Sequence, residues 1–151
     1  MKLETLTASQ AAKLLENKEV SSVELTQACL DRIELRNGEV GAFAHIDPEF
    51  SLKQAALADS EPRRSSFQGV PFGVKDVIDT KDFLTERGTP IHAGRQPVAD
   101  AKCVQLMREA GAVLLGKLVS TEYAMFTPNE TRHPLDLTRT AGGSSSGTGA
   151  A

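Results

Sequence analysis

The sequence predicts an α/β fold in which N-terminal helices precede strand–helix–strand units of a mixed sheet covered by helices. Helix-start signals recur in the first 60 residues. An apolar, β-prone run follows at Val70–Val74, and another, Ala112–Leu115, comes directly after a helix-spaced segment. Such continuous apolar runs are typical of buried strands. We expect a single domain over residues 1–151, with a helical region over 1–60 and an α/β part over 67–151.

Capping signals predict where the first two helices begin. In a capping box, a Ser or Thr hydroxyl and a Glu or Gln three residues later satisfy each other's backbone N–H groups. Thr7 with Gln10 and Ser21 with Glu24 fit this pattern, and apolar residues follow each pair at helical spacing. The pair Asn37-Gly38 is expected to end the second helix through a left-handed residue.

A short strand and a third helix are expected next. Phe43–Ile46 is predicted to be the strand. Pro48 is predicted to begin the helix, because the first helical turn needs no N–H group from proline. The polar residues from Glu61 to Ser66 are predicted to be a surface connector.

Strand, helix and strand follow one another in the second half. Val70–Val74 is predicted to be a strand, Asp100 to cap a helix that Gly111 ends, and Ala112–Leu115 to be a buried strand. This order favours a right-handed crossover within a parallel or mixed sheet. If Ala151 is the true terminus, these strands lack central neighbours, and an isolated chain is expected to associate or dissolve poorly.

Composition is typical of a soluble globular protein. Hydrophobic residues make up 40% and charged residues 25% of the chain. The formal net charge of −3 argues against a dedicated nucleic-acid binder. No run approaches the length of a membrane span, and the N-terminus lacks the apolar region of a signal peptide.

Residues that commonly bind metals do not cluster in this sequence. His45, His92 and His133 stand apart, without ligands at metal-site spacing, so we predict no metal and no cofactor. Cys29 and Cys103 each lie in an apolar, helix-like stripe and are predicted to be buried thiols. Two unpaired thiols favour a reducing cytoplasm.

Lys75 is the first candidate catalytic residue. It follows the apolar run Val70–Val74, and a lysine at the end of a buried strand loses hydration, which favours its neutral form. A neutral lysine can act as a base near neutral pH. The alternative is a surface lysine paired with Asp76 or Asp79, since most lysines remain solvated.

The segment Gly142–Gly147 is the second candidate. It sets Ser144, Ser145 and Ser146 between glycines, and such a loop can arrange N–H groups and hydroxyls around an anion or a polarised carbonyl. The alternative is a flexible Gly/Ser linker. The sequence lacks the Gly-Lys-Ser/Thr of a nucleotide phosphate loop and the Gly-x-Ser-x-Gly elbow of a Ser-His-Asp hydrolase.

Four segments, in this order, resemble the amidase signature family. They are Gly69–Asp76, Ala110–Lys117, Glu122–Ala124, and the stretch from Pro134 to Gly147. The resemblance runs from about Gly69 to Ala151 and extends more loosely to the N-terminal helices. It implies the amidase signature fold, of which this chain would be the N-terminal portion.

The resemblance also implies an amidase that uses a Ser–cis-Ser–Lys triad. The family lysine maps onto Lys75, and the bridging serine, which follows a cis peptide bond, maps onto Ser144. Ser145 would be a supporting hydroxyl. In the family, the lysine takes a proton from the bridging serine, which activates a nucleophilic serine that forms an acyl-enzyme. No serine in residues 1–151 matches that nucleophile, so the chain alone is expected to be inactive.

Three functional hypotheses follow from this resemblance. The first is a stand-alone cytoplasmic amidase that acts on a small-molecule amide, and the run Ser144-Ser145-Ser146 favours it. Such an enzyme could be a homodimer, and neither nucleic acid nor a membrane is expected as a direct partner. The second is part of the A subunit of a glutamyl/aspartyl-tRNA amidotransferase, working with partner subunits and a glutamine donor. The third is a non-catalytic fragment that keeps the family fold.

Overall fold

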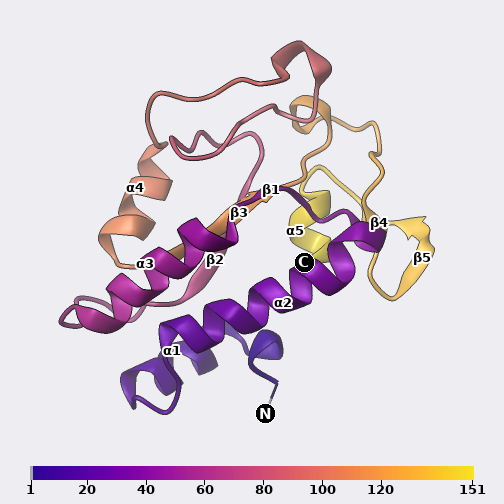
Figure 1. Ribbon diagram of the computed structural model, residues 1–151. Helices are drawn as coiled ribbons and strands as arrows, with labels where there is room; N and C mark the ends of the chain where they lie inside the picture. Colours follow the sequence, from indigo (N-terminus) through magenta and orange to yellow (C-terminus); the bar gives the residue numbers. More distant parts are fainter. Residues whose placement is uncertain (1) are drawn as a thin grey trace. The chain divides into compact units, whose positions relative to one another are not determined.

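The computed structural model describes residues 2–151 (Figure 1). These residues form two compact units. Each unit is assembled from three separate stretches of the chain. The first unit comprises residues 2–33, Asp47–Phe72 and Lys102–Leu115. The second comprises Glu34–Ile46, Gly73–Ala101 and Gly116–Ala151.

Helices dominate the first part of the chain, and strands become more frequent after it, as expected. The α-helices are α1 (Ala8–Glu16), α2 (Ser22–Val40), α3 (Pro48–Ser60), α4 (Lys102–Glu109) and α5 (Ser146–Ala150). The short 3-10 helices are η1 (Leu3–Thr5), η2 (Pro90–His92) and η3 (Glu122–Ala124). The strands are β1 (Phe43–Ile46), β2 (Pro71–Lys75), β3 (Val113–Leu118), β4 (Arg132–His133) and β5 (Asp136–Thr140).

Both predicted capping boxes are confirmed. The Gln10 N–H donates to the Thr7 hydroxyl at 3.3 Å, and the Thr7 N–H donates to the Gln10 side chain at 2.9 Å. The Glu24 N–H donates to the Ser21 hydroxyl at 3.1 Å, and the Ser21 N–H donates to the Glu24 carboxylate at 2.8 Å. These bonds satisfy N–H groups that a helix leaves unpaired at its start, so local sequence fixes where α1 and α2 begin.

The predicted end of α2 is wrong. The helix continues past Asn37-Gly38 to Val40, and Gly41 takes the left-handed conformation, with φ of 64°. Val40 is buried, which extends the apolar stripe by almost one turn. The Asn37 side chain remains within the helix and bonds the N–H and the C=O of Phe43, at 2.8 and 3.0 Å. Asn37 therefore fastens the start of β1 instead of ending the helix.

The three-stranded sheet has the order β1-β3-β2 and is mixed, as predicted. In the first unit, the Val113 N–H donates to the Val70 carbonyl at 2.9 Å, and in the second, the Asp76 N–H donates to the Leu118 carbonyl at 2.8 Å. Pairing therefore advances in the same direction along β2 and β3, as in a parallel pair. By contrast, β1 and β3 are antiparallel.

A glycine in β3 permits close pairing with β1. Gly116 lies opposite Ile46 in the ladder. A β-carbon at Gly116 would overlap the carbonyl oxygen of His45, so no larger residue fits without moving the backbone. All six residues of β3 are buried, which matches the apolar run that predicted this strand.

Helix α4 shows why one cysteine prediction failed. Val104 is buried, whereas Cys103 is exposed and Cys29 in α2 is half-buried. Successive helical residues point about 100° apart, so the burial of Val104 leaves its neighbour Cys103 facing solvent. The predicted end of this helix is confirmed, because Gly111 is left-handed with φ of 84°.

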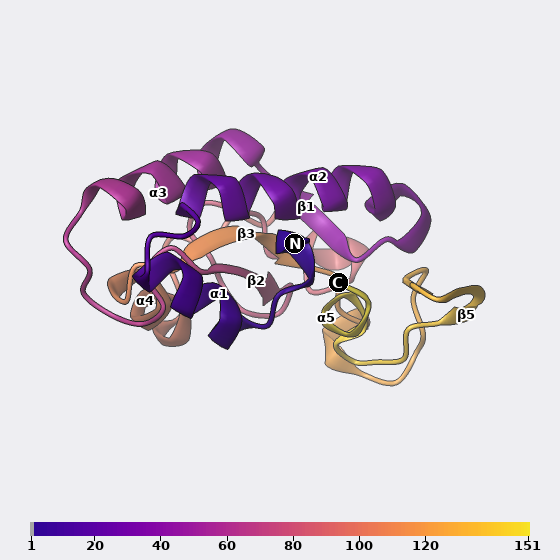
Figure 2. The same cartoon turned by 90° about the horizontal axis from the view of Figure 1, so that it is seen from below.

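In the second unit, a small apolar cluster packs beside the C-terminal helix. Val40, Ala42 and Ala150 are buried, and Phe43 and Ala141 pack against them. The β4–β5 hairpin belongs to the same unit and stands apart from α5 (Figure 2). Across residues 2–151, none of the helices combines the length and the apolar composition that a membrane crossing requires.

Candidate active site

Lys75 and Ser144 meet in the second unit. Lys75 is the last residue of β2, and its Nζ donates to the Ser144 hydroxyl at 2.7 Å. Both residues are half-buried. The alternative ion pairs are absent in this described part of the chain, because Asp76 faces Lys117 and Asp79 pairs with Arg95. The two residues that the sequence singled out are therefore brought into direct contact.

The chain that follows β3 holds the Ser144 backbone. The Ser144 carbonyl accepts the Thr121 N–H at 3.1 Å and the Ser120 hydroxyl at 3.3 Å. The Gly147 N–H donates to the Val119 carbonyl at 2.9 Å. The Gly143–Ser144 peptide bond is cis. These contacts make the segment a defined loop, so the linker alternative is wrong.

The other two serines of the loop have different surroundings. Ser145 is exposed, precedes α5, and its hydroxyl makes no hydrogen bond with residues 2–151. Ser146 is buried, and its hydroxyl donates to the Val119 carbonyl at 3.3 Å and accepts from the Asn129 side chain at 2.7 Å. Ser146 therefore anchors the loop, and Ser145 leaves its hydroxyl open to solvent.

A buried lysine, Lys117, lies close to Asp76, the residue that follows Lys75. The Lys117 side chain is 0% exposed, and its Nζ donates to the Ile78 carbonyl and the Thr85 hydroxyl, both at 2.6 Å. The Asp76 carboxylate lies 3.7 Å away. Burial lowers the pKa of Lys117 to about 8, although the carboxylates of Asp76 and Asp79 oppose this shift.

Two further ion pairs surround Asp76. Arg95 donates to both carboxylate oxygens of Asp79 at 2.7 Å, and these bonds hold the pKa of Asp79 below its usual value. Glu86 lies 2.9 Å from the His45 ring and accepts the Gly94 N–H at 2.6 Å. The Gly94 bond is the main cause of the lowered pKa of Glu86, and the His45 contact adds to it.

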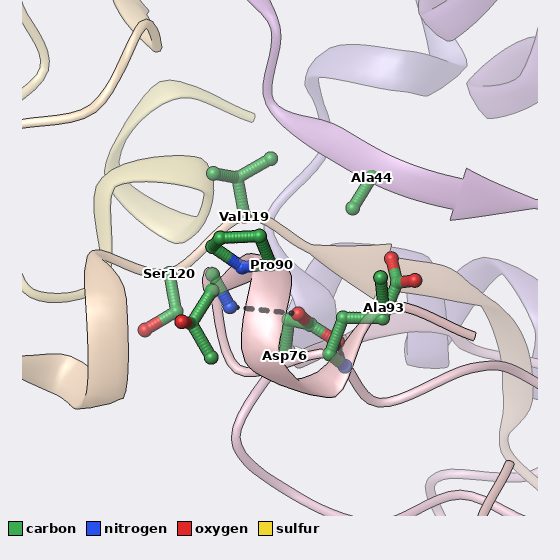
Figure 3. A pocket seen from close by; sticks show the side chains of 9 residues that line it. Ala44, Asp76, Pro90, Ala93, Val119 and Ser120 are labelled. Atoms are coloured by element: carbon green, nitrogen blue, oxygen red, sulfur yellow. Dashed lines mark hydrogen bonds between the residues drawn. The ribbon is translucent and has the colours of Figure 1, made fainter. Parts of the chain in front are cut away.

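A cavity of about 290 Å³ lies in the same unit (Figure 3). Apolar side chains, among them Pro90 and Val119, share its wall with polar ones, among them Asp76 and Ser120. The remaining residues of the wall are Ala44, Glu86, Gly88, Thr89 and Ala93. Ser120 belongs both to this wall and to the hydrogen bonds that hold Ser144. The cavity is therefore connected to the Lys75–Ser144 pair through a shared residue.

The three histidines occupy separate places. His45 contacts Glu86, and His92 lies 3.1 Å from the Tyr123 hydroxyl. His133 accepts the Leu135 N–H at 3.2 Å. Within residues 2–151, no group of three or more His, Cys, Asp or Glu residues has an arrangement that could hold a metal ion.

Comparison with known families assigns this site to a family. The family model described as Amidase matches residues 24–151, which include Lys75 and Ser144. The chain belongs to the amidase signature family. The resemblance inferred from Gly69–Asp76 and the Gly/Ser loop is thereby confirmed.

The curated relatives of this amidase signature chain include A subunits of glutamyl-tRNA(Gln) amidotransferases. The subunit from Chloroflexus aggregans is 41% identical over 159 residues, covering 99% of this chain and 33% of that protein. The subunit from Geobacter sp. is 41% identical over 160 residues, covering 100% and 33%. The chain therefore spans about a third of the length of these relatives.

Solved structures of amidases share the fold. Peptide amidase from Stenotrophomonas maltophilia superposes with a TM-score of 0.87 at 30% identity, covering 97% of this chain and 33% of that one. A fatty acid amide hydrolase superposes with a TM-score of 0.89 at 26% identity, covering 98% and 28%. A protein from a vestigial complex related to an s-triazine catabolic enzyme gives 0.89 at 30% identity, covering 96% and 34%. The amidase signature fold is thus shown.

Neither the buried contacts of Lys117 nor the cavity is predicted from the sequence. A charged residue inside the apolar run Val113–Leu118 was the available signal, since a lysine in a buried strand requires polar partners. Its partners, Ile78 and Thr85, lie 39 and 32 residues away, and no local pattern connects them to it.

Proposed function

We propose that this chain supplies the lysine and the bridging serine of an amide-cleaving active site. The observation that carries the proposal is the 2.7 Å contact between the Lys75 Nζ and the Ser144 hydroxyl. A serine hydroxyl becomes a good nucleophile only when a neighbour removes its proton. Membership of the amidase signature family supports amide cleavage as the reaction class.

In the proposed mechanism, Lys75 and Ser144 move protons for a nucleophilic serine. The Lys75 amine accepts the Ser144 proton, and the Ser144 oxygen takes the proton of the nucleophile. That serine attacks the amide carbonyl, the C–N bond breaks, and the proton returns along the same path to the leaving amine or ammonia. Water then hydrolyses the acyl-enzyme. The nucleophile is assigned to polypeptide outside residues 1–151, and Ser145 is assigned a supporting role.

The test uses the native polypeptide that contains these 151 residues, with a simple aryl amide as substrate. Lys75→Met removes the base and is expected to lower kcat by about 10³-fold or more, as loss of a proton-transfer residue does. Lys81→Met is the matched control, since Lys81 is an exposed lysine of the same unit. Equal activity in the two variants would rule out the proposed role of Lys75.

A second candidate function is glutamine hydrolysis within a tRNA-dependent amidotransferase. The A subunits that are 41% identical to this chain favour it. The proton relay would be the same, with glutamine as the amide and ammonia as the released product. Ammonia release from glutamine only in the presence of partner subunits would support this candidate. Equal hydrolysis of aryl amides with and without partners would favour the stand-alone amidase.

A further inference from the structure

We propose that Lys117 is a positioning residue: its ammonium closes the loop over residues 76–88 and thereby holds Lys75 against Ser144. The inference rests on the proposed function, because its kinetic test needs Lys75 and Ser144 to act together. Its structural basis is independent and consists of the contacts that converge on the Lys117 Nζ.

One buried ammonium joins both ends of this loop. The Lys117 Nζ donates to the Ile78 carbonyl near the start of the loop and to the Thr85 hydroxyl near its end. The Asp76 carboxylate lies 3.7 Å from the same Nζ. An ammonium has only donors, so Lys117 makes two hydrogen bonds and one ion pair with these acceptors.

Asp76 extends this closure to the residues that follow Thr85. Its carboxylate accepts the N–H groups of Glu86 and Gly88 at 3.2 and 3.3 Å, and its own carbonyl accepts the Arg87 N–H at 3.0 Å. Without the Lys117 charge, a buried carboxylate would remain with only these neutral donors. Asp76 directly follows Lys75, so movement of Asp76 moves the catalytic lysine.

The strand that carries Lys117 also leads to the other member of the pair. After Leu118, the chain continues to Ser120 and Thr121, which bond the Ser144 carbonyl. Lys117 therefore lies on the segment that contacts both sides of the site: Asp76 beside Lys75, and the Ser144 backbone. Displacing it would change the 2.7 Å contact between the two.

The charge on Lys117 is sensitive to pH in the working range of an enzyme. With its pKa lowered to about 8, the side chain is an ammonium at neutral pH and loses its proton as the pH rises above this value. His45, which lies opposite Lys117 in the β1–β3 ladder, contacts the Glu86 carboxylate. The charged groups that act on it are Asp76, Asp79 and Arg95.

The first experiment is a mutant cycle in the native polypeptide, measured as aryl amide hydrolysis at pH 7. Lys117→Met and Asp76→Asn are each expected to lower kcat about tenfold or more with little change in KM, and the double variant to lose no more than either, because coupled residues are not additive. Lys53→Met is the matched control, since Lys53 is an exposed lysine that pairs with Glu49. Wild-type kcat in Lys117→Met, or additive losses, would overturn the inference.

The second experiment is the pH profile of kcat, which a merely structural role would not move. Thr85→Val removes one acceptor of the ammonium, so the alkaline fall in kcat should begin at lower pH than in the wild type. In Lys117→Met that fall should disappear. A Thr85→Val profile identical to the wild type would overturn the inference, even if Lys117→Met does not fold.

The two proposals can fail separately. If Lys75→Met retains full activity, the proposed function itself fails. If Lys75→Met is inactive and the Lys117 variants are normal, only the positioning role fails.

Discussion

The Nζ of Lys75 lies 2.7 Å from the hydroxyl oxygen of Ser144, although the two residues are 69 positions apart in the sequence. The two residues come from different elements, the end of β2 and the Gly/Ser loop before α5. Asp76, which follows Lys75, bonds Leu118 at the end of β3. The chain just after β3, residues 119–121, bonds the Gly/Ser loop. This shared support explains how two distant segments form one site.

The two serines of the loop should respond differently to substitution. Ser144→Ala removes the hydroxyl that contacts Lys75 and is expected to lower kcat by about 10³-fold or more. Ser145→Ala removes an exposed hydroxyl, so its supporting role should be worth about one hydrogen bond, at most about tenfold in rate. Steady-state hydrolysis of an aryl amide checks both. Similar losses in the two variants would contradict the assignment.

Two glycines of α5 offer a matched test of the loop's packing. A β-carbon at Gly147 would overlap the Ala42 carbonyl and the Val119 N–H, so Gly147→Ala should lower the free energy of unfolding by about 2 kcal/mol or more. At Gly149 the nearest atom would be 3.6 Å away, so Gly149→Ala should be neutral or stabilising by about 0.5–1 kcal/mol, since alanine favours a helix. Urea unfolding measures both values, and equal effects would refute the close packing at Gly147.

The two cysteines should differ in reactivity. Cys103 is exposed, whereas Cys29 is half-buried and its pKa is raised to about 11, mainly by burial and also by the Glu4 carboxylate. The thiolate is the reactive form, so at pH 8 a thiol reagent should modify Cys103 much faster. Peptide mapping after brief labelling identifies the modified residue. Faster labelling of Cys29 would contradict the observed burial.

The Asp79–Arg95 pair should contribute to stability in a pH-dependent way. Arg95 lowers the pKa of Asp79 in the folded protein, so the stabilising contribution is complete above the unfolded value of about 3.9 and is lost as the pH falls through the folded value. In Arg95→Met, the free energy of unfolding should therefore decline less steeply from pH 6 to pH 2. Urea unfolding across this range measures the slope.

Arg139→Met is the control for that experiment. Arg139 pairs with Asp136, but Thr138 is the main cause of the lowered pKa of Asp136. In this control, the free energy of unfolding should therefore decline from pH 6 to pH 2 about as steeply as in the wild type. If the slope for Arg95→Met equals that of the control, the Asp79–Arg95 pair does not contribute to the pH dependence of the free energy of unfolding.

Local signals in the sequence predicted the elements better than their ends and exposures. The Thr7–Gln10 box could be predicted because both partners lie within one turn. The end of α2 could not, because it depends on the burial of Val40 and on the bonds between Asn37 and Phe43. The exposure of Cys103 similarly depends on which face of α4 packs, and a short apolar stripe does not determine this.

The site itself could be predicted in part. The motifs of the sequence indicate Lys75 and Ser144, but a motif does not show that two residues are in contact. The role of Lys117 requires knowing that Ile78, Thr85 and Asp76 surround it, and only the fold brings these residues together. Tertiary contacts of this kind have no signature in a single sequence.

The measurement that tests the central claim most directly is a double-mutant cycle on Lys75 and Ser144 in the native polypeptide. kcat/KM is measured for Lys75→Met, Ser144→Ala and the double variant. If the two residues form one proton relay, each single variant loses almost all of the activity and the double variant loses no more. Losses that multiply in the double variant would mean that the two residues act independently, and the proposed relay would be wrong.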